Sequence, residues 1–382
     1  MKKLFYWACL GLIIFEIANV YFIMPIPGSQ EINSIQVAYL LFSWRWWFRI
    51  LFSLLIIIGL YKSFSQSKIL ILASLLLVGI KIYYTNYEMS ADHMFLPVEN
   101  LQFKTVEDNK IPSGQLIIGI VYKDIAKAYP IQFLGYHHQV RDTISDKQFM
   151  ITYCTVCRTG RVYEPMVDQQ YDQFRLVGMD HFNAMFEDSR TKSWWRQSTG
   201  EAIAGKSKNK FLPEYPSQQM TLNQWIIIHP QTLIMQPDTL FQVEYDSLSN
   251  YENGTRKGKL TRRDSQSWEK KSWIIGLELN GISKAYDWNE LQSKQIIQDE
   301  INNIPIAVVL SDDKNSFASY ILNTKNQLLS IQQDTLLLGQ RKYLFSGKSL
   351  TDSVPNLTLI KCYQEYWHSW QTFHPKTLKF VE

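Results

Sequence analysis

Apolar positions are concentrated at the start of the chain, where three long apolar runs follow one another within the first 84 residues. They are LFYWACLGLIIFEIANVYFIM (4–24), a stretch within 37–61 that ends ILFSLLIIIGLY, and ILILASLLLVGIKIYY (69–84). Each run approaches the roughly 20 apolar residues that a helix needs to cross a bilayer. The pattern therefore predicts a membrane anchor over residues 1–85, with three transmembrane helices and the lipid bilayer as its partner.

Ionisable residues interrupt two of these runs. Arg45 and Arg49 lie in the middle run, in or just after the WRWW cluster at 44–47, and tryptophan is typical of the headgroup level. Glu16 lies in the first run, where an acid requires a partner inside the membrane. We expect Glu16 to pair with Arg45 or Arg49, and an ion path is the alternative.

Basic residues near the runs predict the orientation of the anchor. Lys2 and Lys3 precede the first run, and Lys62 and Lys68 lie in the short loop between the second and third runs. The positive-inside rule keeps both segments cytoplasmic, so three crossings place everything after residue 84 outside the cytoplasm. We expect a protein of the bacterial inner membrane. A cleaved signal peptide is the competing interpretation, but the first run is long and ends in MPIPGS.

Beyond the anchor, the chain repeats itself. LIIGIVYKDIAKAYP (116–130) matches WIIGLELNGISKAYD (273–287) at a shift of 157 positions, and WIIIHPQTL (225–233) matches WQTFHPKTL (370–378) at a shift of 145. Self-similarity of this kind indicates a repeated structural unit. The sequence thus predicts an α+β, mostly β fold, with a first repeat over 95–240 and a second, degenerate repeat over 265–382.

Each copy opens with an apolar strand, a turn at Lys-Asp or Asn-Gly and an alternating return strand, which is typical of a β-hairpin. The β-branched and aromatic segment KQFMITY predicts a further strand. CTVCRTG then aligns with the turn SDDKNS of the second copy, so the cysteines are expected at a hairpin tip. Residues 221–228 predict a short helix with Thr221 as its N-cap.

The two copies serve as a control on one another, because features present in both are expected to be structural. Asp142 recurs as Asp299, and the His-Pro pair at 229–230 recurs at 374–375. The candidate reactive residues occur only in the first copy; Cys154, Cys157 and His137 align with Ser311, Lys314 and Lys294. A site is therefore expected within residues 130–205.

Cysteines at positions i and i+3 of a turn can share a soft metal ion, form a small-ring disulfide or exchange with other thiols. Zinc would require more ligands than two sulfurs, whereas Cu(I) tolerates fewer. His137, His138 and His181 are the candidate auxiliary ligands. Because side chains alternate along an extended segment, His137 and His138 are expected to point to opposite faces.

A second group of residues is a candidate ligand pocket, because it contains aromatic side chains, cations and hydrogen-bond acceptors. Its members are Arg158, Asn183, Trp194, Trp195, Arg196, Gln197 and Glu201. In the alternative interpretation, the tryptophans close the core and Arg196 pairs with Glu201.

Composition excludes some classes of function. The net charge is +4, and the longest basic segment is KSKNK (206–210), so nucleic acid is not an expected partner. Four cysteines do not make a disulfide framework in a chain of this length. The composition does not indicate a particular small-molecule or protein partner.

The motifs YCTVCRTGRVY, SWWRQSTGEAIAG and LNQWIIIHPQTL, in this order and spacing, resemble domain-of-unknown-function family 3179 of bacteria and archaea. The resemblance covers residues 115–240 and extends more weakly through the second copy. It implies no established activity. Members typically read Tyr-Cys-Pro-x-Cys-Gly, and this chain has Thr155 for the proline and Arg158 for the glycine. An arginine there would stabilise a thiolate.

Three hypotheses follow. The leading one is a soft-metal site, holding copper or zinc, at Cys154 and Cys157. The second is an enzyme that performs thiol–disulfide exchange. The third is a non-enzymatic ligand-binding or interaction module that uses the segment from Trp194 to Glu201.

Overall fold

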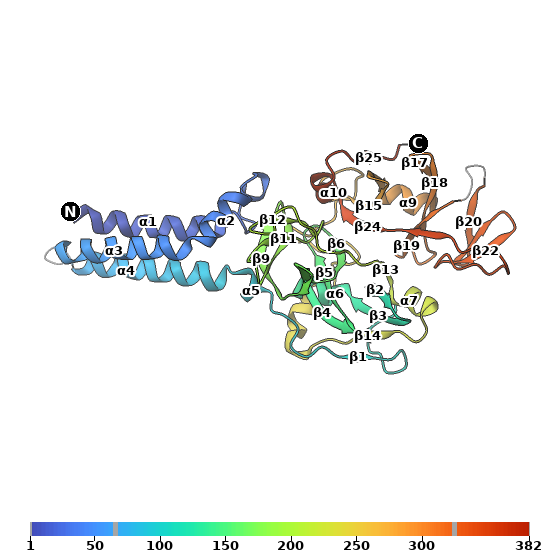
Figure 1. Ribbon diagram of the computed structural model, residues 1–382, viewed down its shortest axis with the longest axis horizontal. Helices are drawn as coiled ribbons and strands as arrows, with labels where there is room; N and C mark the ends of the chain where they lie inside the picture. The colour runs from blue at the N-terminus through green and yellow to red at the C-terminus, as the bar shows by residue number, and fades with distance from the viewer. Residues whose placement is uncertain (1, 64–67, 323–326, 382) are drawn as a thin grey trace. The chain divides into compact units, whose positions relative to one another are not determined.

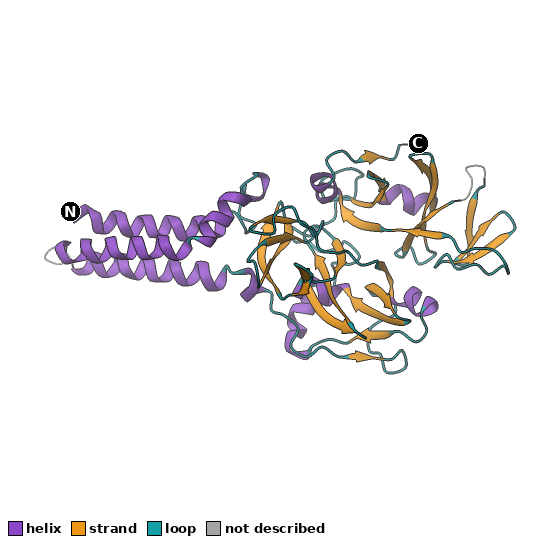
Figure 2. Ribbon diagram, in the orientation of Figure 1, coloured by secondary structure: helices purple, strands orange, loops and turns teal. Residues whose placement is uncertain are grey.

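A computed structural model of the chain describes residues 2–63, 68–322 and 327–381, and it has an α+β fold (Figures 1 and 2). The chain divides into two compact units. The first unit contains residues 1–96 and 167–212, and the second contains 97–166 and 213–382. The segment 167–212 therefore packs with the N-terminal helices rather than with the strands that flank it in sequence.

The first unit begins with a bundle of apolar helices. They are α1 (Lys2–Tyr21), α2 (Ile35–Ser43), α3 (Arg45–Ser63) and α4 (Lys68–Tyr83), with the 3-10 helix η1 (Ser29–Glu31) between α1 and α2 and the π-helix η2 (Tyr84–Glu88) after α4. Two segments, Lys3–Tyr21 and Lys68–Glu88, are long and apolar enough to cross a membrane. The pair α2 and α3, bent by 60°, would add a third if it forms one span. These helices indicate a membrane protein. Residues 64–67 of the loop used to predict orientation lie outside the described residues.

Glu16 is fully buried in this bundle, and its partner is Arg49. The Arg49 Nε and Nη2 atoms donate to the two carboxylate oxygens at 2.7 and 3.0 Å. Asn86 of η2 donates to Glu16 at 3.0 Å and accepts from Arg49 at 2.6 Å. The predicted pairing of Glu16 is thus confirmed with Arg49, whereas Arg45 instead donates to the carbonyl oxygen of Phe42 at 2.6 Å.

A four-stranded sheet completes the first unit. Its order is β12 (Ala202–Ala204), β11 (Trp194–Arg196), β10 (Asn183–Asp188) and β9 (Phe174–Asp180). One face of the sheet packs on the end of α1 and on α2, where Trp194 meets the rings of Tyr39 and Phe42. The short helix α5 (Ala91–Met94) also contacts the sheet, and the strands β7 (Met166–Val167) and β8 (Gln170–Tyr171) form a separate ribbon.

The second unit contains two sets of elements with a similar order. The first set comprises β1 (Phe103–Lys104), β2 (Leu116–Tyr122), β3 (Ile125–Pro130), α6 (Ile131–His137), β4 (Gln139–Ile144), β5 (Lys147–Cys154), β6 (Thr159–Tyr163), β13 (Gln218–Thr221), α7 (Leu222–Ile228) and β14 (Leu233–Met235). The helices η3 (Thr239–Phe241) and α8 (Gln242–Ser247) follow it. Its sheets run β1-β14-β3-β2-β13 and β4-β5-β6.

The second set follows a similar order, without a counterpart of β1 among its described residues. It comprises β15 (Trp273–Leu279), β16 (Ile282–Asp287), α9 (Trp288–Lys294), β17 (Ile296–Ile301), β18 (Ile304–Leu310), β19 (Phe317–Ile321), β23 (Thr358–Ile360), β24 (Cys362–Tyr366), α10 (Trp367–Phe373) and β25 (Leu378–Lys379). Its sheets run β24-β15-β16-β25 and β17-β18-β19-β23. A further sheet is formed by β20 (Leu329–Gln332), β21 (Thr335–Leu338) and β22 (Arg341–Leu344).

Pairing directions agree between the sets as well. The first hairpin is antiparallel in each, β13 and β24 pair with it in the antiparallel direction, and β14 and β25 pair with it in the parallel direction. The hairpin turns at Lys123-Asp124 and Asn280-Gly281 have positive φ angles, as the sequence predicted for this type of turn.

Equivalent side-chain contacts also occur in the two sets of strands. The Tyr129 hydroxyl donates to Asp142 at 2.7 Å, and in the second set the Tyr286 hydroxyl donates to Asp299 at 2.8 Å. Lys127 and Lys284 form ion pairs with the same two aspartates. These aspartates therefore have structural partners in both sets.

Each set also packs one tryptophan onto one glycine. A Cβ atom added at Gly119 would lie 2.5 Å from the Trp225 ring, and one added at Gly276 would overlap the Trp370 ring in the same way. Both indole nitrogens donate to a threonine hydroxyl seven residues later, at 2.8 Å in each case. The predicted helix of the first set, with Thr221 as its N-cap, is confirmed as α7.

One local prediction was wrong. His137 and His138 do not lie on an extended segment, because residues 131–137 form α6 and His138 is its left-handed C-cap with φ 60°. The buried face of Ile131, Leu134 and Tyr136 stabilises this helix against the strands. A helix of seven residues carries too few apolar positions for its periodicity to be distinguished from a strand.

Candidate functional site

The two cysteines lie at a hairpin tip, as predicted. Cys154 ends β5, residues 155–158 form the turn, and Thr159 begins β6. Arg158 occupies the position where the backbone is left-handed, with φ 57°. Both cysteines are fully buried and both are free thiols.

The sulfur atoms of this turn interact with each other. The Cys157 thiol is in hydrogen-bond contact with Cys154 and with Ser369, and burial raises the pKa of Cys157 well above its usual value. The neighbouring Cys154 raises this pKa further, because two thiolates so close together repel each other. The pair is therefore neutral unless a cation compensates its charge.

A cation is present in the same place. The Lys271 ammonium donates to the carbonyl oxygens of Val156, at 2.6 Å, and Leu260, at 2.7 Å, and lies over the ring of Tyr366. Burial lowers the pKa of Lys271 to about 8, whereas the cysteines act to raise it. The Lys271 ammonium and the cysteines are thus close enough to interact electrostatically.

Strand β24 and helix α10 close the other side of the turn. The Tyr366 backbone N–H donates to the Cys157 carbonyl oxygen at 2.9 Å, and a His368 ring nitrogen lies 3.3 Å from the Val156 carbonyl oxygen. Burial lowers the pKa of His368 to about 3, so its ring is neutral. Ser369, which contacts Cys157, donates to Glu365 at 3.1 Å. The cysteines of the first set are thus enclosed by residues of the second.

Arg158 is a buried cation beside the turn. Its guanidinium stacks on the Trp273 ring at 3.6 Å, and its Nε donates to Gln364 at 2.7 Å. It also donates to the backbone carbonyl oxygens of Tyr251 and Glu252. Among the described residues it forms no ion pair, which is unusual for a buried charge. The Glu252 carboxyl, whose pKa burial raises to about 7, has one oxygen that accepts from Leu116.

Sequence reasoning did not find Lys271, His368 or Ser369. They lie more than a hundred positions after the cysteines, outside the range 130–205 in which the site was expected. Their spacing from the cysteines carries no motif. The comparison of the two similar sequence segments singled out residues found only in the first segment, so it did not point to Lys271, His368 or Ser369.

The predicted auxiliary histidines have other partners. The His137 Nε2 atom lies 2.6 Å from the Tyr245 hydroxyl, and the His138 Nδ1 atom lies 3.0 Å from the Tyr136 carbonyl oxygen. His181 belongs to the other unit, where it pairs with Asp180 at 2.7 Å. Within residues 2–63, 68–322 and 327–381, no three His, Cys, Asp or Glu side chains form a group that could hold a metal ion.

The predicted ligand-pocket residues, apart from Arg158, come together in the sheet β9–β12. Arg196 bridges Asp180 at 2.6 Å and Glu201 at 3.0 Å. The buried Trp194 and Trp195 donate to Glu187 and Asp188. Asn183 and Gln197 are hydrogen-bonded to each other at 2.9 Å. These contacts agree with the alternative interpretation, in which this segment closes a core.

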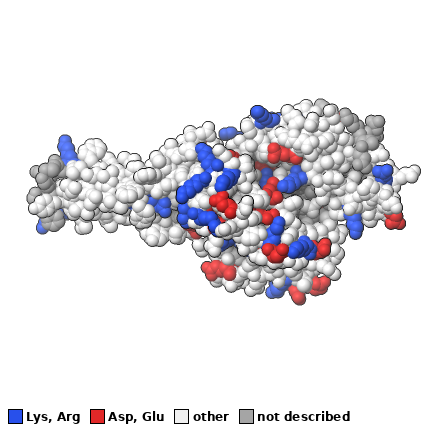
Figure 3. Space-filling model, viewed as in Figure 1, with Lys and Arg blue, Asp and Glu red and all other residues white. Residues whose placement is uncertain are grey.

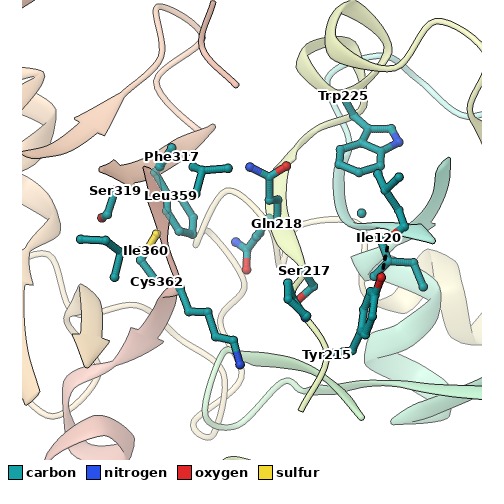
Figure 4. Close-up of a pocket in the computed structure, with 16 residues that line it drawn as sticks. Ile120, Tyr215, Ser217, Gln218, Trp225, Phe317, Ser319, Leu359, Ile360 and Cys362 are labelled. Carbon is teal, nitrogen blue, oxygen red and sulfur yellow. Dashed lines mark hydrogen bonds between the residues drawn. The ribbon is translucent and has the colours of Figure 1, made fainter. Parts of the chain in front are cut away.

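A pocket of about 390 Å³ lies elsewhere in the second unit, between β2 and β13 on one side and β19, β23 and β24 on the other (Figure 4). Its walls are largely apolar, and the polar residues that line it include Ser217, Gln218, Gln219, Ser319 and Lys361. Gln219 of this wall donates to Gln364 at 3.2 Å, and Gln364 also accepts from Arg158. The pocket wall is thus connected to the cysteine turn by hydrogen bonds.

Comparison with known proteins identifies one family. The model of the family described as Protein of unknown function (DUF3179) matches residues 97–377. No curated protein and no solved structure matches the chain.

Proposed function

Because the chain belongs to the DUF3179 family, whose description assigns no activity, we propose from the site itself that it is a membrane-anchored protein that binds one Cu(I) ion between Cys154 and Cys157. The donor set supports this choice. Soft thiolates select Cu(I), which accepts two ligands, whereas a structural zinc site takes four. The two sulfurs are already in contact with one another. The histidines have other partners, so the proposed ligands are the two sulfurs alone.

The main support for the proposal is the buried positive charge of Lys271 beside the cysteine turn. Two thiolates and one Cu(I) ion together have a charge of −1, and a buried charge requires compensation. Lys271 supplies it, and its ammonium lies at the carbonyl oxygen of Val156 between the two cysteines. The protein thus holds a desolvated cation where the complex would place an anion.

The two sets of strands in the second unit enclose this site. We propose that the two sets of strands are tandem repeats over 95–240 and 265–382, because their element order, pairing directions and Gly–Trp contacts agree. The second repeat lacks the cysteines and covers those of the first. The segment 167–212 is then an insertion in the first repeat that packs with the anchor.

The anchor would hold the site outside the cytoplasm. We propose three spans over residues 1–85 in the bacterial inner membrane, with α3 as the middle span and α2, bent from it by 60°, at the membrane interface. The basic residues at positions 2, 3, 62 and 68 would remain cytoplasmic under the positive-inside rule. Residues 97–381 would then lie outside.

A competition experiment tests the proposal. The purified full chain is titrated with Cu(I) under anaerobic, reducing conditions against a coloured Cu(I) chelator. One equivalent is expected to bind, and the double variant C154S/C157S is expected to bind none. C362S is the matched control, because Cys362 is a partly buried free thiol elsewhere in the same unit. A wild-type chain that leaves all copper with the chelator would end the proposal.

The contact between the two sulfurs also favours a second candidate, a thiol–disulfide couple. Oxidation would join Cys154 and Cys157 by one S–S bond, with two electrons and two protons passing to an external disulfide. A redox titration followed by thiol labelling measures the potential of the couple. A value below about −300 mV would indicate a structural bond and argue against exchange.

A further inference from the structure

Two loops at one edge of the sheet β9–β12 lie side by side. One loop (189–193) connects β10 to β11, and the other (205–210) follows β12. The Ser207 backbone N–H donates to the Ser193 hydroxyl at 2.9 Å, and the hydroxyls of Thr191 and Ser207 lie 3.2 Å apart. The two loops therefore present one continuous surface.

This surface is basic. It exposes Arg190, Lys192, Lys206, Lys208 and Lys210. Lys210 pairs with Asp168 at 2.5 Å, and Arg190 lies 3.9 Å from Asp172. Lys192, Lys206 and Lys208 form no ion pair with the described part of the chain. On the face drawn in Figure 3, Lys and Arg side chains gather beside the helical anchor.

Hydrogen bonds within the first unit hold the region of these loops against helix α2. The Tyr39 hydroxyl of α2 donates to the Lys192 carbonyl oxygen at 3.1 Å, and Gln36 donates to Ile203 at 2.8 Å. Trp44, at the junction of α2 with α3, comes five residues after Tyr39. Five residues span about 7.5 Å along a helix.

The junction itself has the composition of a membrane interface. Trp44, Trp46 and Trp47 are 55%, 62% and 67% exposed, and exposed tryptophans at the end of an apolar helix are typical of the headgroup level. The Debye length at physiological ionic strength is about 8 Å, so charges this close to a bilayer surface still act on it.

We propose that the loops 189–193 and 205–210 bind the phosphate headgroups of anionic phospholipids beside the anchor. Lysines and arginines near a negatively charged membrane surface are attracted to it, and three of these side chains have no acidic partner among the residues that the structure describes. The contact would fix the orientation of the sheet β9–β12 on the bilayer.

Amine labelling tests this inference. The full chain is reconstituted in nanodiscs of phosphatidylcholine alone, or with a third of the lipid replaced by phosphatidylglycerol. Mass spectrometry then measures the labelling rates of Lys192, Lys206 and Lys208. These rates are expected to fall about fivefold with the anionic lipid and to recover in high salt, because salt screens the attraction. Equal rates in both bilayers would overturn the inference.

Two controls separate lipid binding from other effects. Inorganic phosphate added to phosphatidylcholine nanodiscs is expected to give no protection, and equal protection by free phosphate would contradict a headgroup site. The double variant K192Q/K208Q is expected to retain less phosphatidylglycerol on purification, whereas K257Q/K259Q, with the same loss of charge at exposed positions of the second unit, retains the wild-type amount. Equal loss in both variants would also contradict the inference.

Discussion

The Lys271 ammonium donates a 2.6 Å hydrogen bond to the carbonyl oxygen of Val156, the residue that precedes Cys157. A residue far along the chain thus places a buried positive charge on the cysteine turn. The metal hypothesis depends on this contact, because it provides the compensating charge for an anionic copper–dithiolate complex.

Replacing Lys271 by methionine is therefore expected to weaken Cu(I) binding by about ten- to a hundredfold, since a buried counter-charge is lost. K271R keeps the charge and is expected to recover part of the affinity. The chelator competition described above measures both variants, and K270M is the control, because Lys270 is its exposed neighbour. An affinity of K271M equal to that of K270M would show that the charge is not needed, while the two sulfurs could still bind copper.

The matching Gly–Trp contacts predict matching effects on stability. G119A and G276A would each force a methyl group into a tryptophan ring, and overpacking of this kind costs about 1–3 kcal/mol. Thermal unfolding of the full chain in detergent measures the loss. G114A is the control, since a Cβ at Gly114 meets nothing within 4 Å. A large loss in only one of the two variants would contradict equivalent packing.

Much of this fold could be predicted because the two similar segments of the sequence could be compared with one another. The hairpins, the turn at Cys154 and Cys157, and the capped helix after Thr221 all follow from local residue patterns. The sequence could not predict the surroundings of the turn, because Lys271 and His368 reach it by tertiary packing. Nor did it predict that the segment 167–212 packs with the anchor, since apolar residues such as Trp194 do not indicate which surface they cover.

The buried pair in the anchor predicts a non-additive effect. E16Q leaves the Arg49 charge without its anionic partner, and R49Q leaves Glu16 uncompensated, so each is expected to cost about 3 kcal/mol or more. The double variant E16Q/R49Q removes both charges and is expected to cost less than the two single changes together. Thermal unfolding in detergent measures these effects, with E31Q as the control at an exposed acid of the same unit. Strict additivity would indicate that the two side chains do not interact.

Glu252 predicts a pH dependence of stability. Burial raises its pKa to about 7 from the ordinary value of 4.5, so the folded chain holds this proton more tightly than the unfolded chain. Stability is therefore lost as pH rises from about 4.5 to about 7, and the loss remains above that range. E252Q cannot ionise and is expected to gain about 2–3 kcal/mol relative to wild type between pH 5 and pH 8.

Unfolding midpoints at these two pH values provide the measurement. E269Q, which removes an exposed acid, should follow the wild type. A difference between E252Q and wild type that is the same at both pH values would show that Glu252 does not titrate in this range.

The most direct test of the central claim is X-ray absorption spectroscopy at the copper edge on the full chain loaded with one equivalent of Cu(I). The account predicts two sulfur ligands and no nitrogen ligand, and loss of this signal in C154S/C157S. A copper site with histidine nitrogens, or one that persists without Cys154 and Cys157, would contradict it.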